Sequence, residues 1–395
     1  MARLFNFKMM EPASIEHLAT LRAKSGSDVD KEIYAFKDKA GREVGLRFDL
    51  TVGMTRYVCS KRGLRPPVKL AAAAGAWRYD EPQHARYRWF RQWDLEIFGP
   101  ESLDADAEVI EATVRLFQRL GLGDVTVNVG DRRAVQAFVG KALGVEDEGR
   151  AVELMRALDK SQKRSLPELS KEYEQKGFDP RDVKSLFDFG SIAGPPEKVL
   201  DLLGERKVDA PSLASLNDLL RERGVKSVSF NMSIVRGIDY YTGVVFEVSD
   251  SAHPGLGSLA GGGRYDFLPR AFGRPELSAT GAAGGIDRIT MSMERSKDPV
   301  PLLVYVAVAG PGARDWAHAV LRELRAGGIA CQAPLQPRPL SKQLEDANAL
   351  GASWSLIVGE REASSRSVTV KDMRTGAEEL LPLDGALARL RAPRA

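Results

Sequence analysis

The chain has 395 residues, of which 43% are hydrophobic and 28% are charged, a composition typical of folded globular proteins and not of disordered or membrane proteins. This length exceeds what one hydrophobic core usually organises, so we expect two or three domains, while the net charge of +3 is compatible with a nucleic-acid partner without indicating one. No segment is long and apolar enough to span a membrane and the N-terminus lacks the apolar run of a secretion signal, so the expected location is the cytoplasm.

Short strands and helices are predicted to alternate along the first part of the chain. Residues 5–10 are expected to be extended and residues 14–22 to be helical, because Ile15, Leu18 and Leu21 recur at helical spacing. Further strands are predicted at 43–50, within 67–80 and at 88–98, and an amphipathic helix is predicted at 106–120.

Residues 132–224 have helical periodicity and many charges, which predicts a helical insertion. Strand patterns return at 228–235 and 244–248, before a glycine-dense run at 255–263 and a segment of small apolar residues at 279–293. After an expected linker at 297–301, the order strand, helix, helix, strand (302–309, 313–326, 340–350 and 354–358) predicts a small α/β domain with some parallel pairing. The expected parts are therefore 1–131 and 225–296 for a discontinuous first domain, 132–224 for the insertion and 302–391 for the last domain.

The densest polar segment runs from Arg78 to Glu96, where two strand-like flanks surround a loop that contains Pro82. Alternate residues of a strand share a face, so Gln92, Asp94 and Glu96 should point to one side. A face with carboxylates beside arginines can hold a substrate that carries both a cationic amine and phosphates. The alternative is a charged hairpin whose residues merely pair with one another, and the charge pattern alone does not separate the two readings.

A second segment, 235–247, combines an arginine with paired tyrosines. Arg236 offers a guanidinium that can position and neutralise a carboxylate or phosphate, and Tyr240 and Tyr241 offer an aromatic wall. Taken alone, ordinary core tyrosines and a surface arginine explain this pattern better.

Glycines at 261–263 and 284–285 would permit a ligand to approach the backbone closely, and Arg288 could reach a phosphate. Each run is weak evidence by itself, because glycine-rich segments are most often turns. No Walker-type or dinucleotide-binding fingerprint accompanies them.

Taken together and in order, these segments resemble the motifs of class II aminoacyl-tRNA synthetases. Residues 78–96 resemble motif 2, residues 285–288 resemble motif 3, and Pro12 stands where motif 1 has its proline. The resemblance implies an α+β catalytic domain, an antiparallel sheet flanked by helices, in the parts 1–131 and 225–296.

Two further segments resemble the histidine-specific motifs of histidyl-tRNA synthetases, Arg-Gly-Ile-Asp-Tyr-Tyr (236–241) and Gly-Gly-Arg-Tyr-Asp (262–266). Leu-Ile-Val-Gly-Glu (356–360) is similar to the anticodon-binding domain of that family, which the resemblance places at 302–391. The resemblance covers essentially the whole chain, with the helical insertion at 132–224 between the two catalytic parts.

The reaction that the resemblance implies is attack of the histidine carboxylate on the α-phosphorus of ATP, followed by transfer of the histidyl group to the 3′ end of tRNA(His). Mg²⁺ would share the phosphate charge, and no protein ligand for it is assigned. The implied catalytic residues are Arg78 and Arg236. The implied histidine-binding residues are Asp49, Thr51, Arg78, Gln92, Glu96, Arg236, Tyr240, Tyr241 and Tyr265. The implied ATP-binding residues are Arg78, Asp80, Arg86, Phe90 and Arg288, and Gln83 is the expected contact with the tRNA acceptor end.

The sequence departs from the family pattern at its start, because it begins just before the motif 1 strand and is short of the long helix that usually precedes it. That helix usually builds a dimer interface, and a homodimer is still expected. Asp80 and Ala85 replace the usual glutamate and glycine of motif 2, but no charged catalytic group is lost.

The main alternative is a synthetase-like regulatory subunit of ATP phosphoribosyltransferase, which would bind histidine without charging tRNA. Such paralogues generally lack the anticodon-binding domain and lose motif arginines, whereas this chain keeps Arg78, Arg86, Arg236 and Arg288. The sequence therefore favours the enzyme.

Overall fold

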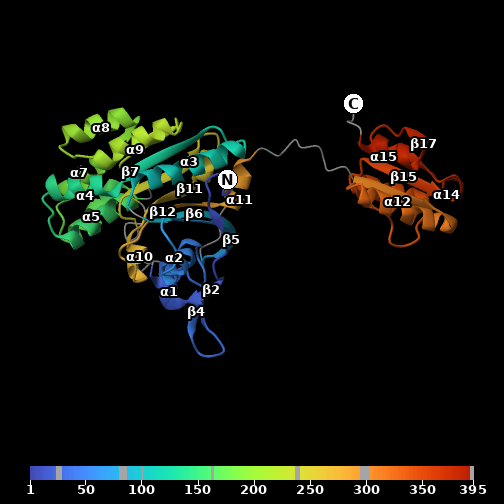
Figure 1. Ribbon diagram of the computed structural model, residues 1–395. Coiled ribbons are helices and arrows are strands. Elements are labelled where there is room, and N and C mark those ends of the chain that lie inside the picture. The colour runs from blue at the N-terminus through green and yellow to red at the C-terminus, as the bar shows by residue number, and fades with distance from the viewer. Residues whose placement is uncertain are drawn as a thin grey trace. The chain divides into compact units, whose positions relative to one another are not determined.

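The computed structural model describes residues 1–23, 29–79, 87–99, 101–161, 164–235, 241–293 and 303–391. The chain forms two compact units, Met1–Glu294 and Arg295–Ala395, each with its own core (Figure 1). None of the helices in the described ranges is long and apolar enough to cross a membrane. The expected linker at 297–301 lies outside the described residues.

The first unit is built on one large sheet, which has nine strands in the described residues. In spatial order these are β1 (Lys8–Met9), β5 (Val68–Trp77), β6 (Trp89–Gly99), β12 (Ser278–Gly285), β11 (Ser258–Arg264), β10 (Val244–Asp250), β7 (Val125–Asp131), β9 (Val228–Asn231) and β8 (Ala193–Gly194). All neighbours from β5 to β7 pair antiparallel, whereas β1 with β5 and β7 with β9 pair parallel. The predicted antiparallel sheet is confirmed.

The two faces of the sheet pack against different elements (Figure 1). Helix α3 (Leu103–Arg119) covers one face, where Trp93 and Leu95 join its core. Helix α3 begins at Ser102, whose side chain accepts a hydrogen bond from the Asp104 amide (3.2 Å), as an N-cap does. The opposite face is covered by α1 (Leu18–Arg22), α2 (Thr51–Ser60) and a small sheet of β2 (Ile15–His17), β4 (Glu43–Leu46) and β3 (Ala35–Lys37). Even-numbered residues of β6 therefore share one face, as the alternation of the sequence predicted, and this face is the one that α2 covers.

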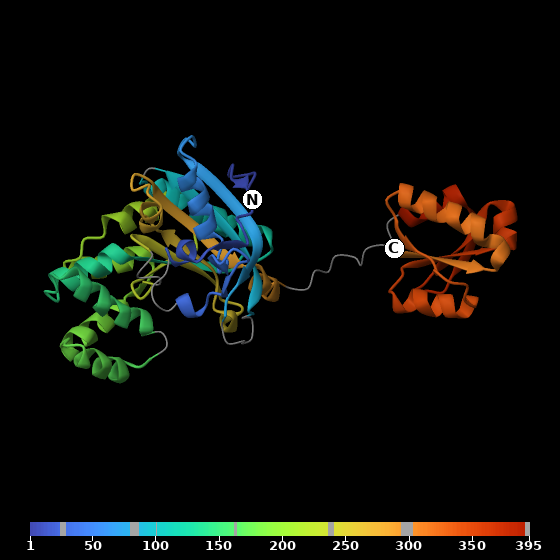
Figure 2. The ribbon, with the colours of Figure 1, turned by 90° about the horizontal axis from the view of Figure 1, so that it is seen from below.

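The helices predicted within residues 132–224 are present, and they lie beside β7, β9 and β8 (Figures 1 and 2). These helices are α4 (Arg132–Lys141), α5 (Glu148–Lys160), α6 (Leu166–Gln175), α7 (Pro180–Gly190), α8 (Pro196–Glu205) and α9 (Pro211–Glu222). Several begin at residues that the sequence supplies for this purpose: Asp147 and Asp179 accept hydrogen bonds from the amides of the first turn, and proline follows Asp179. Helices α10 (Phe267–Ala271) and α11 (Ile286–Ser292) complete the described helices of the unit.

Four local predictions were wrong in extent, and one of them is the strand predicted at 228–235, which ends at Asn231. Only Lys8–Met9 of residues 5–10 form a strand, because the preceding residues turn back with Asn6 at a φ of 56°. The helix predicted at 14–22 begins at Leu18, since Ile15–His17 pair with β4 instead. The strand predicted at 43–50 ends at Leu46 and leads into α2.

The second unit has a five-stranded sheet in its described residues, with the order β14-β13-β15-β16-β17. Its strands are β13 (Leu303–Ala309), β14 (Ala330–Gln332), β15 (Trp354–Gly359), β16 (Ser367–Asp372) and β17 (Glu378–Pro382), and its helices are α12 (Arg314–Ala326), α13 (Leu340–Ala349), α14 (Glu360–Ser365) and α15 (Leu383–Arg391). β13 pairs parallel with β14 and β15, so the predicted α/β domain with some parallel pairing is confirmed. The short β14, between the two predicted helices, was missed.

Candidate active site

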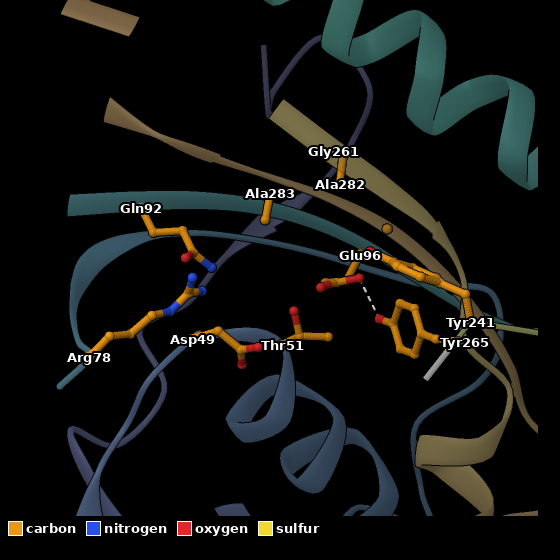
Figure 3. A pocket seen from close by; sticks show the side chains of 11 residues that line it. Asp49, Thr51, Arg78, Gln92, Glu96, Tyr241, Gly261, Tyr265, Ala282 and Ala283 are labelled. Carbon is orange, nitrogen blue, oxygen red and sulfur yellow. Dashed lines mark hydrogen bonds between the residues drawn. The ribbon is translucent and has the colours of Figure 1, made fainter. Parts of the chain in front are cut away.

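Two adjoining cavities open on the face of the large sheet that α2 covers. The first, of about 480 Å³, is lined by Asp49, Thr51, Arg78, Gln92, Glu96, Tyr241, Gly261, Tyr265, Gly281, Ala282 and Ala283 (Figure 3). The second, of about 980 Å³, is lined by Arg78, Tyr87, Phe90, Gln92, Glu247, Ser258, Leu259, Ala260, Gly261, Ala283, Gly284, Gly285, Asp287 and Arg288. Arg78 and Gln92 border both cavities, so a ligand in one can meet a ligand in the other at these side chains.

The polar residues of the first cavity are spread along its length (Figure 3). Arg78 lies at one end, where its Nε donates a hydrogen bond to the Phe48 carbonyl (3.0 Å). Glu96 and Tyr265 lie at the other end, each only 1% exposed, and the Tyr265 hydroxyl donates a hydrogen bond to Glu96. One end therefore suits a carboxylate and the other suits a group with N–H donors.

Between these ends, Asp94 is a buried hub for the neighbouring side chains. It accepts hydrogen bonds from the Gln92 amide (2.8 Å) and from the Thr51 hydroxyl (3.2 Å), which joins β6 to the first residue of α2. Asp49, two residues before Thr51, accepts a hydrogen bond from the backbone amide of Val52 (3.3 Å). These contacts fix the orientation of polar groups that would otherwise rotate freely.

Carboxylates surround Tyr241, which lines the first cavity. Burial raises the pKa of Tyr241, and the carboxylates of Glu96, Asp49, Asp94 and Glu247 raise it further. The phenol therefore stays protonated and can donate a hydrogen bond. Asp49 and Glu96 line this cavity and Asp94 bonds two of its lining side chains, so the cavity favours a ligand that carries positive charge.

The second cavity is lined by two cationic side chains, those of Arg78 and Arg288. Arg288, in the first turn of α11, donates a hydrogen bond to the Ser258 carbonyl (2.9 Å), and the Arg78 guanidinium lies 5.1 Å from the centre of the Phe90 ring. Two arginines beside a half-buried aromatic ring suit a nucleotide with its phosphates. Glu247, which accepts a hydrogen bond from the Ser258 hydroxyl (2.7 Å), and Asp287 are the carboxylates that line this cavity in the described residues.

The floor of both cavities consists of residues with little or no side chain. Opposite Glu96, Asp94 and Gln92 on β6 stand Gly281, Ala283 and Gly285 on β12, and the next strand, β11, places Gly263 and Gly261 beside Gly281 and Ala283. Directly paired residues share a face of the sheet, so space opens above these strands. The interpretation of the glycine runs as turns is wrong, because Gly261–Gly263 lie in β11 and Gly284–Gly285 end β12.

The structure brings together every described residue that the sequence predicted. Asp49, Thr51, Arg78, Gln92, Glu96, Tyr241 and Tyr265 line the first cavity, and Arg78, Phe90 and Arg288 line the second. The remaining predicted residues, Asp80, Gln83, Arg86, Arg236 and Tyr240, lie outside the described residues.

Sequence reasoning missed Glu247, Ser258, Gly281 and Asp287 as lining residues. Glu247 could have been found from the strand pattern of β10. It stands two residues after Val245, and alternate residues of a strand share a face, so its polar side chain marks that face as one that is not purely apolar. Gly281 gives no local signal, since its place opposite Glu96 depends on long-range pairing. Across the described part of the chain, no three His, Cys, Asp or Glu residues group as a metal site would require.

This sheet, with a carboxylate-rich cavity and an arginine-bordered cavity joined at Arg78, defines the chain as a class II aminoacyl-tRNA synthetase. A sequence model described as "Histidyl-tRNA synthetase" matches residues 2–289, and one described as "Anticodon binding domain" matches residues 303–392. The chain belongs to the histidyl-tRNA synthetase family.

Similar proteins have the corresponding name. The chain is 37% identical over 400 residues to a protein named "Histidine–tRNA ligase" from Pyrococcus abyssi, covering 98% of this chain and 91% of the relative. A protein of the same name from Thermococcus kodakarensis is 35% identical over 401 residues, with coverage of 98% and 91%.

Solved structures agree in fold. Histidyl-tRNA synthetase from Nostoc sp. PCC 7120 matches with a TM-score of 0.79 and 24% identity, covering 98% of this chain and 93% of that chain. An "ATP phosphoribosyltransferase regulatory subunit/histidyl-tRNA synthetase" from Bacillus halodurans matches with a TM-score of 0.73 and 24% identity, covering 90% of each chain. The second likeness shows only a shared fold, and the ligase relatives together with the anticodon-binding match favour the enzyme over the regulatory alternative.

Proposed function

We propose that this chain is a histidine–tRNA ligase, which forms histidyl-adenylate from histidine and ATP and transfers the histidyl group to tRNA(His). The observation that carries the proposal is that Arg78 lines both a cavity lined by Asp49 and Glu96 and a cavity lined by Arg288 and Phe90. The first cavity suits an amino acid with a cationic amine, and the second suits a nucleotide. A reaction between a carboxylate and a phosphate needs both substrates to meet at one cation.

In the first cavity, histidine would lie with its carboxylate at Arg78 and its imidazole at Glu96 and Tyr265. Gln92 lies beside Arg78, and Asp49 and Thr51 lie between Arg78 and Glu96 (Figure 3). These three side chains would hold the α-amino group and one ring nitrogen. Tyr241 would form the wall of the ring pocket, and we assign Tyr240 and Arg236 to the same site from the sequence resemblance. A site that hydrogen-bonds both ring nitrogens rejects side chains without them, because its buried polar groups would remain unpaired.

In the second cavity, ATP would stack its adenine on Phe90 and place its phosphates between Arg78 and Arg288. Asp80 and Arg86 are assigned to ATP from the resemblance. Magnesium would supply further charge neutralisation at the phosphates. Glu247, one of two described carboxylates that line this cavity, could offer it an oxygen, as donors of that kind suit a hard cation.

The chemical step follows from this arrangement. An oxygen of the histidine carboxylate forms a bond to the α-phosphorus, the bond from the α-phosphorus to the bridging oxygen breaks, and pyrophosphate leaves with the electron pair. Negative charge grows on the α-phosphoryl oxygens, so the guanidinium of Arg78, with Arg236, would stabilise the transition state more than the bound substrates.

Transfer to tRNA would use both units. We assign Gln83 to the acceptor end and the second unit, which matches the anticodon-binding domain, to the anticodon. A homodimer and a cytoplasmic location are part of the proposal, because tRNA charging serves cytoplasmic translation and the family pattern pairs two catalytic domains.

The test is histidine-dependent exchange between ATP and labelled pyrophosphate by the purified chain, with other amino acids as controls, followed by charging of tRNA(His). Exchange with histidine alone among the amino acids, and charging of tRNA, is the expected result. ATP binding without exchange would overturn the proposal, and exchange with another amino acid would change the substrate.

A further inference from the structure

Gly281 occupies an unusual place in the first cavity. It pairs directly with Glu96 on β6 and with Gly263 on β11, so any side chain at this position would point to the cavity face beside Glu96. Glu96 is nearly fully buried, and its carboxylate accepts a hydrogen bond from the Tyr265 hydroxyl (Figure 3). The end of the cavity that we assign to the imidazole is therefore built around one carboxylate.

A side chain at 281 would collide with that carboxylate. A Cβ built on Gly281 lies 1.6 Å from Oε2 of Glu96, 2.5 Å from its Cδ and 2.8 Å from the Leu95 carbonyl oxygen. Contacts this short require one partner to move. The Tyr265 hydroxyl donates its hydrogen bond to the same oxygen, Oε2, so a methyl group at 281 would displace the atom that accepts this bond.

We propose that Gly281 is a specificity-determining residue of the amino-acid cavity: because it lacks a side chain, the Glu96 side chain lies across β12 and presents its carboxylate, fixed by Tyr265, to an N–H group of the bound imidazole. The proposal rests on the proposed function for the identity of that ligand. Gly281 is a positioning residue in this scheme, since it acts through Glu96.

Gly281 and Gly262, which lies on the adjacent strand β11, differ in the kind of atom that an added Cβ would meet first. A Cβ at Gly262 would lie 2.1 Å from the carbonyl oxygen of Gly281 and 2.9 Å from the Cα of Ala282, which are backbone atoms of the adjacent strand. Gly262 is thus needed for strand packing. At Gly281 the two closest atoms belong to the Glu96 side chain, and the nearest backbone atom, the Leu95 carbonyl oxygen, lies 2.8 Å away. An alanine there should therefore displace Glu96 while the backbone needs only a small shift.

A substitution at Gly281 should change the binding of histidine and leave the binding of ATP unchanged. Gly281 and Glu96 line the first cavity only, whereas Arg78 and Gln92 line both. Gly281→Ala should therefore raise the KM for histidine roughly tenfold or more, because a displacement of about 1 Å at a reacting site can cost a factor of 10². The KM for ATP should stay within about twofold.

The experiment is a double-mutant cycle with Gly281→Ala, Glu96→Ala and the double variant. Histidine-dependent pyrophosphate exchange and thermal unfolding are both measured, and Gly123→Ala is the control, because a Cβ there meets nothing within 4 Å. If Gly281 acts through Glu96, adding Gly281→Ala to Glu96→Ala should change the KM for histidine and the melting temperature far less than it does in the wild type.

Several outcomes would overturn the inference. These are an unchanged KM for histidine in Gly281→Ala, equal increases in the KM for histidine and for ATP, or independent effects of the two substitutions. If Gly281→Ala fails to fold, the double variant decides: folding restored by Glu96→Ala supports the inference, and continued failure assigns the collision to the Leu95 carbonyl and overturns it. Absence of exchange in the wild type would instead overturn the proposed function, while the unfolding cycle would still test the coupling.

Discussion

At the scale of single residues, the contact between Tyr265 and Glu96 is the most consequential in the amino-acid cavity. Both side chains are almost fully buried, and the phenol donates its hydrogen bond to a charged acceptor. Hydrogen bonds to charged groups contribute about 1.5–3 kcal/mol. This carboxylate can orient an imidazole only while its own position is fixed.

We predict that Tyr265→Phe raises the KM for histidine by roughly 10- to 100-fold, as about 1.4 kcal/mol corresponds to a factor of ten. Pyrophosphate exchange at varied histidine and saturating ATP measures it. Tyr57→Phe is the matched control, because this half-exposed tyrosine of α2 does not line either cavity. An unchanged KM in Tyr265→Phe would mean that Glu96 holds its position without the phenol.

Residue types in sequence order predicted much of this site. Alternation on one strand placed Gln92, Asp94 and Glu96 on a common face, and the structure has them there. What the sequence could not supply was the neighbour of each residue across the sheet. Gly281 stands opposite Glu96 only because β12 inserts between β6 and β11, strands that are far apart in the chain.

At the scale of elements, boundaries were the weakest part of the prediction. Ile15, Leu18 and Leu21 have helical spacing, yet Ile15–His17 form a strand because β4 offers backbone partners that local periodicity does not reveal. Glycine-rich β11 was harder still, since glycine disfavours strands. Gly261 and Gly263 lie on the cavity face, whereas Gly262 is needed where the backbone of β12 comes close.

One element carries a contact from the helical insertion to the amino-acid cavity. Arg132, the first residue of α4 and buried, donates hydrogen bonds from its amide to the Gly243 carbonyl (3.0 Å) and from its guanidinium to the Tyr241 carbonyl (2.6 Å). The start of α4 thus holds the segment that places Tyr241 in the cavity.

We predict that Arg132→Ala raises the KM for histidine roughly tenfold, because Tyr241 loses its anchor. Arg132→Lys should recover part of the loss, since an ammonium can still donate to one carbonyl. Arg150→Ala is a matched control: this arginine also donates to a backbone carbonyl, that of Gly177 (2.8 Å), but within the insertion. Equal effects of Arg132→Ala and Arg132→Lys would show that packing alone matters.

The insertion also contains a pH-dependent cluster around Glu172 on α6. Its pKa is lowered from 4.5 to about 2, first by the hydrogen bond from Lys160 and then by those from Lys176 and Arg164. A carboxyl group with a lowered pKa in the folded state stabilises the fold above its unfolded pKa, and this contribution is lost as the pH falls through the folded pKa.

We therefore predict that the thermal stability of the insertion declines between about pH 4.5 and about pH 2, in part through Glu172. Glu172→Gln should lower the melting temperature at neutral pH and reduce its dependence on pH in that window. Calorimetric melts across the window measure both, with Glu174→Gln on the same helix as control. A pH dependence that is identical in Glu172→Gln and in the wild type would contradict the assignment.

At the scale of the whole molecule, the chain separates binding of small substrates from the unit that matches the anticodon-binding domain. All described residues of both cavities belong to the first unit, whose two core clusters contain no residue of the second. The alternation of strands and helices after residue 302 was sufficient to predict the second unit as an α/β domain. The division of the first unit into catalytic and insertion parts stays a prediction.

This separation predicts the behaviour of a chain that ends at residue 294. Because every described residue that lines the cavities belongs to the first unit, histidine-dependent pyrophosphate exchange should stay within about tenfold of the full chain, with an unchanged KM for ATP. Charging of tRNA(His) should fall by roughly a hundredfold or more, since loss of about 3 kcal/mol of binding energy lowers affinity by that factor.

Exchange and charging are measured on the same preparation of the shortened chain, which separates loss of activation from loss of tRNA binding. The full-length Gly123→Ala variant, purified in the same way, is the control. Loss of exchange together with charging would mean that the second unit is needed to form the amino-acid and nucleotide cavities. Retention of full charging would mean that tRNA is recognised through the first unit alone, and the role assigned to the second unit would then be wrong.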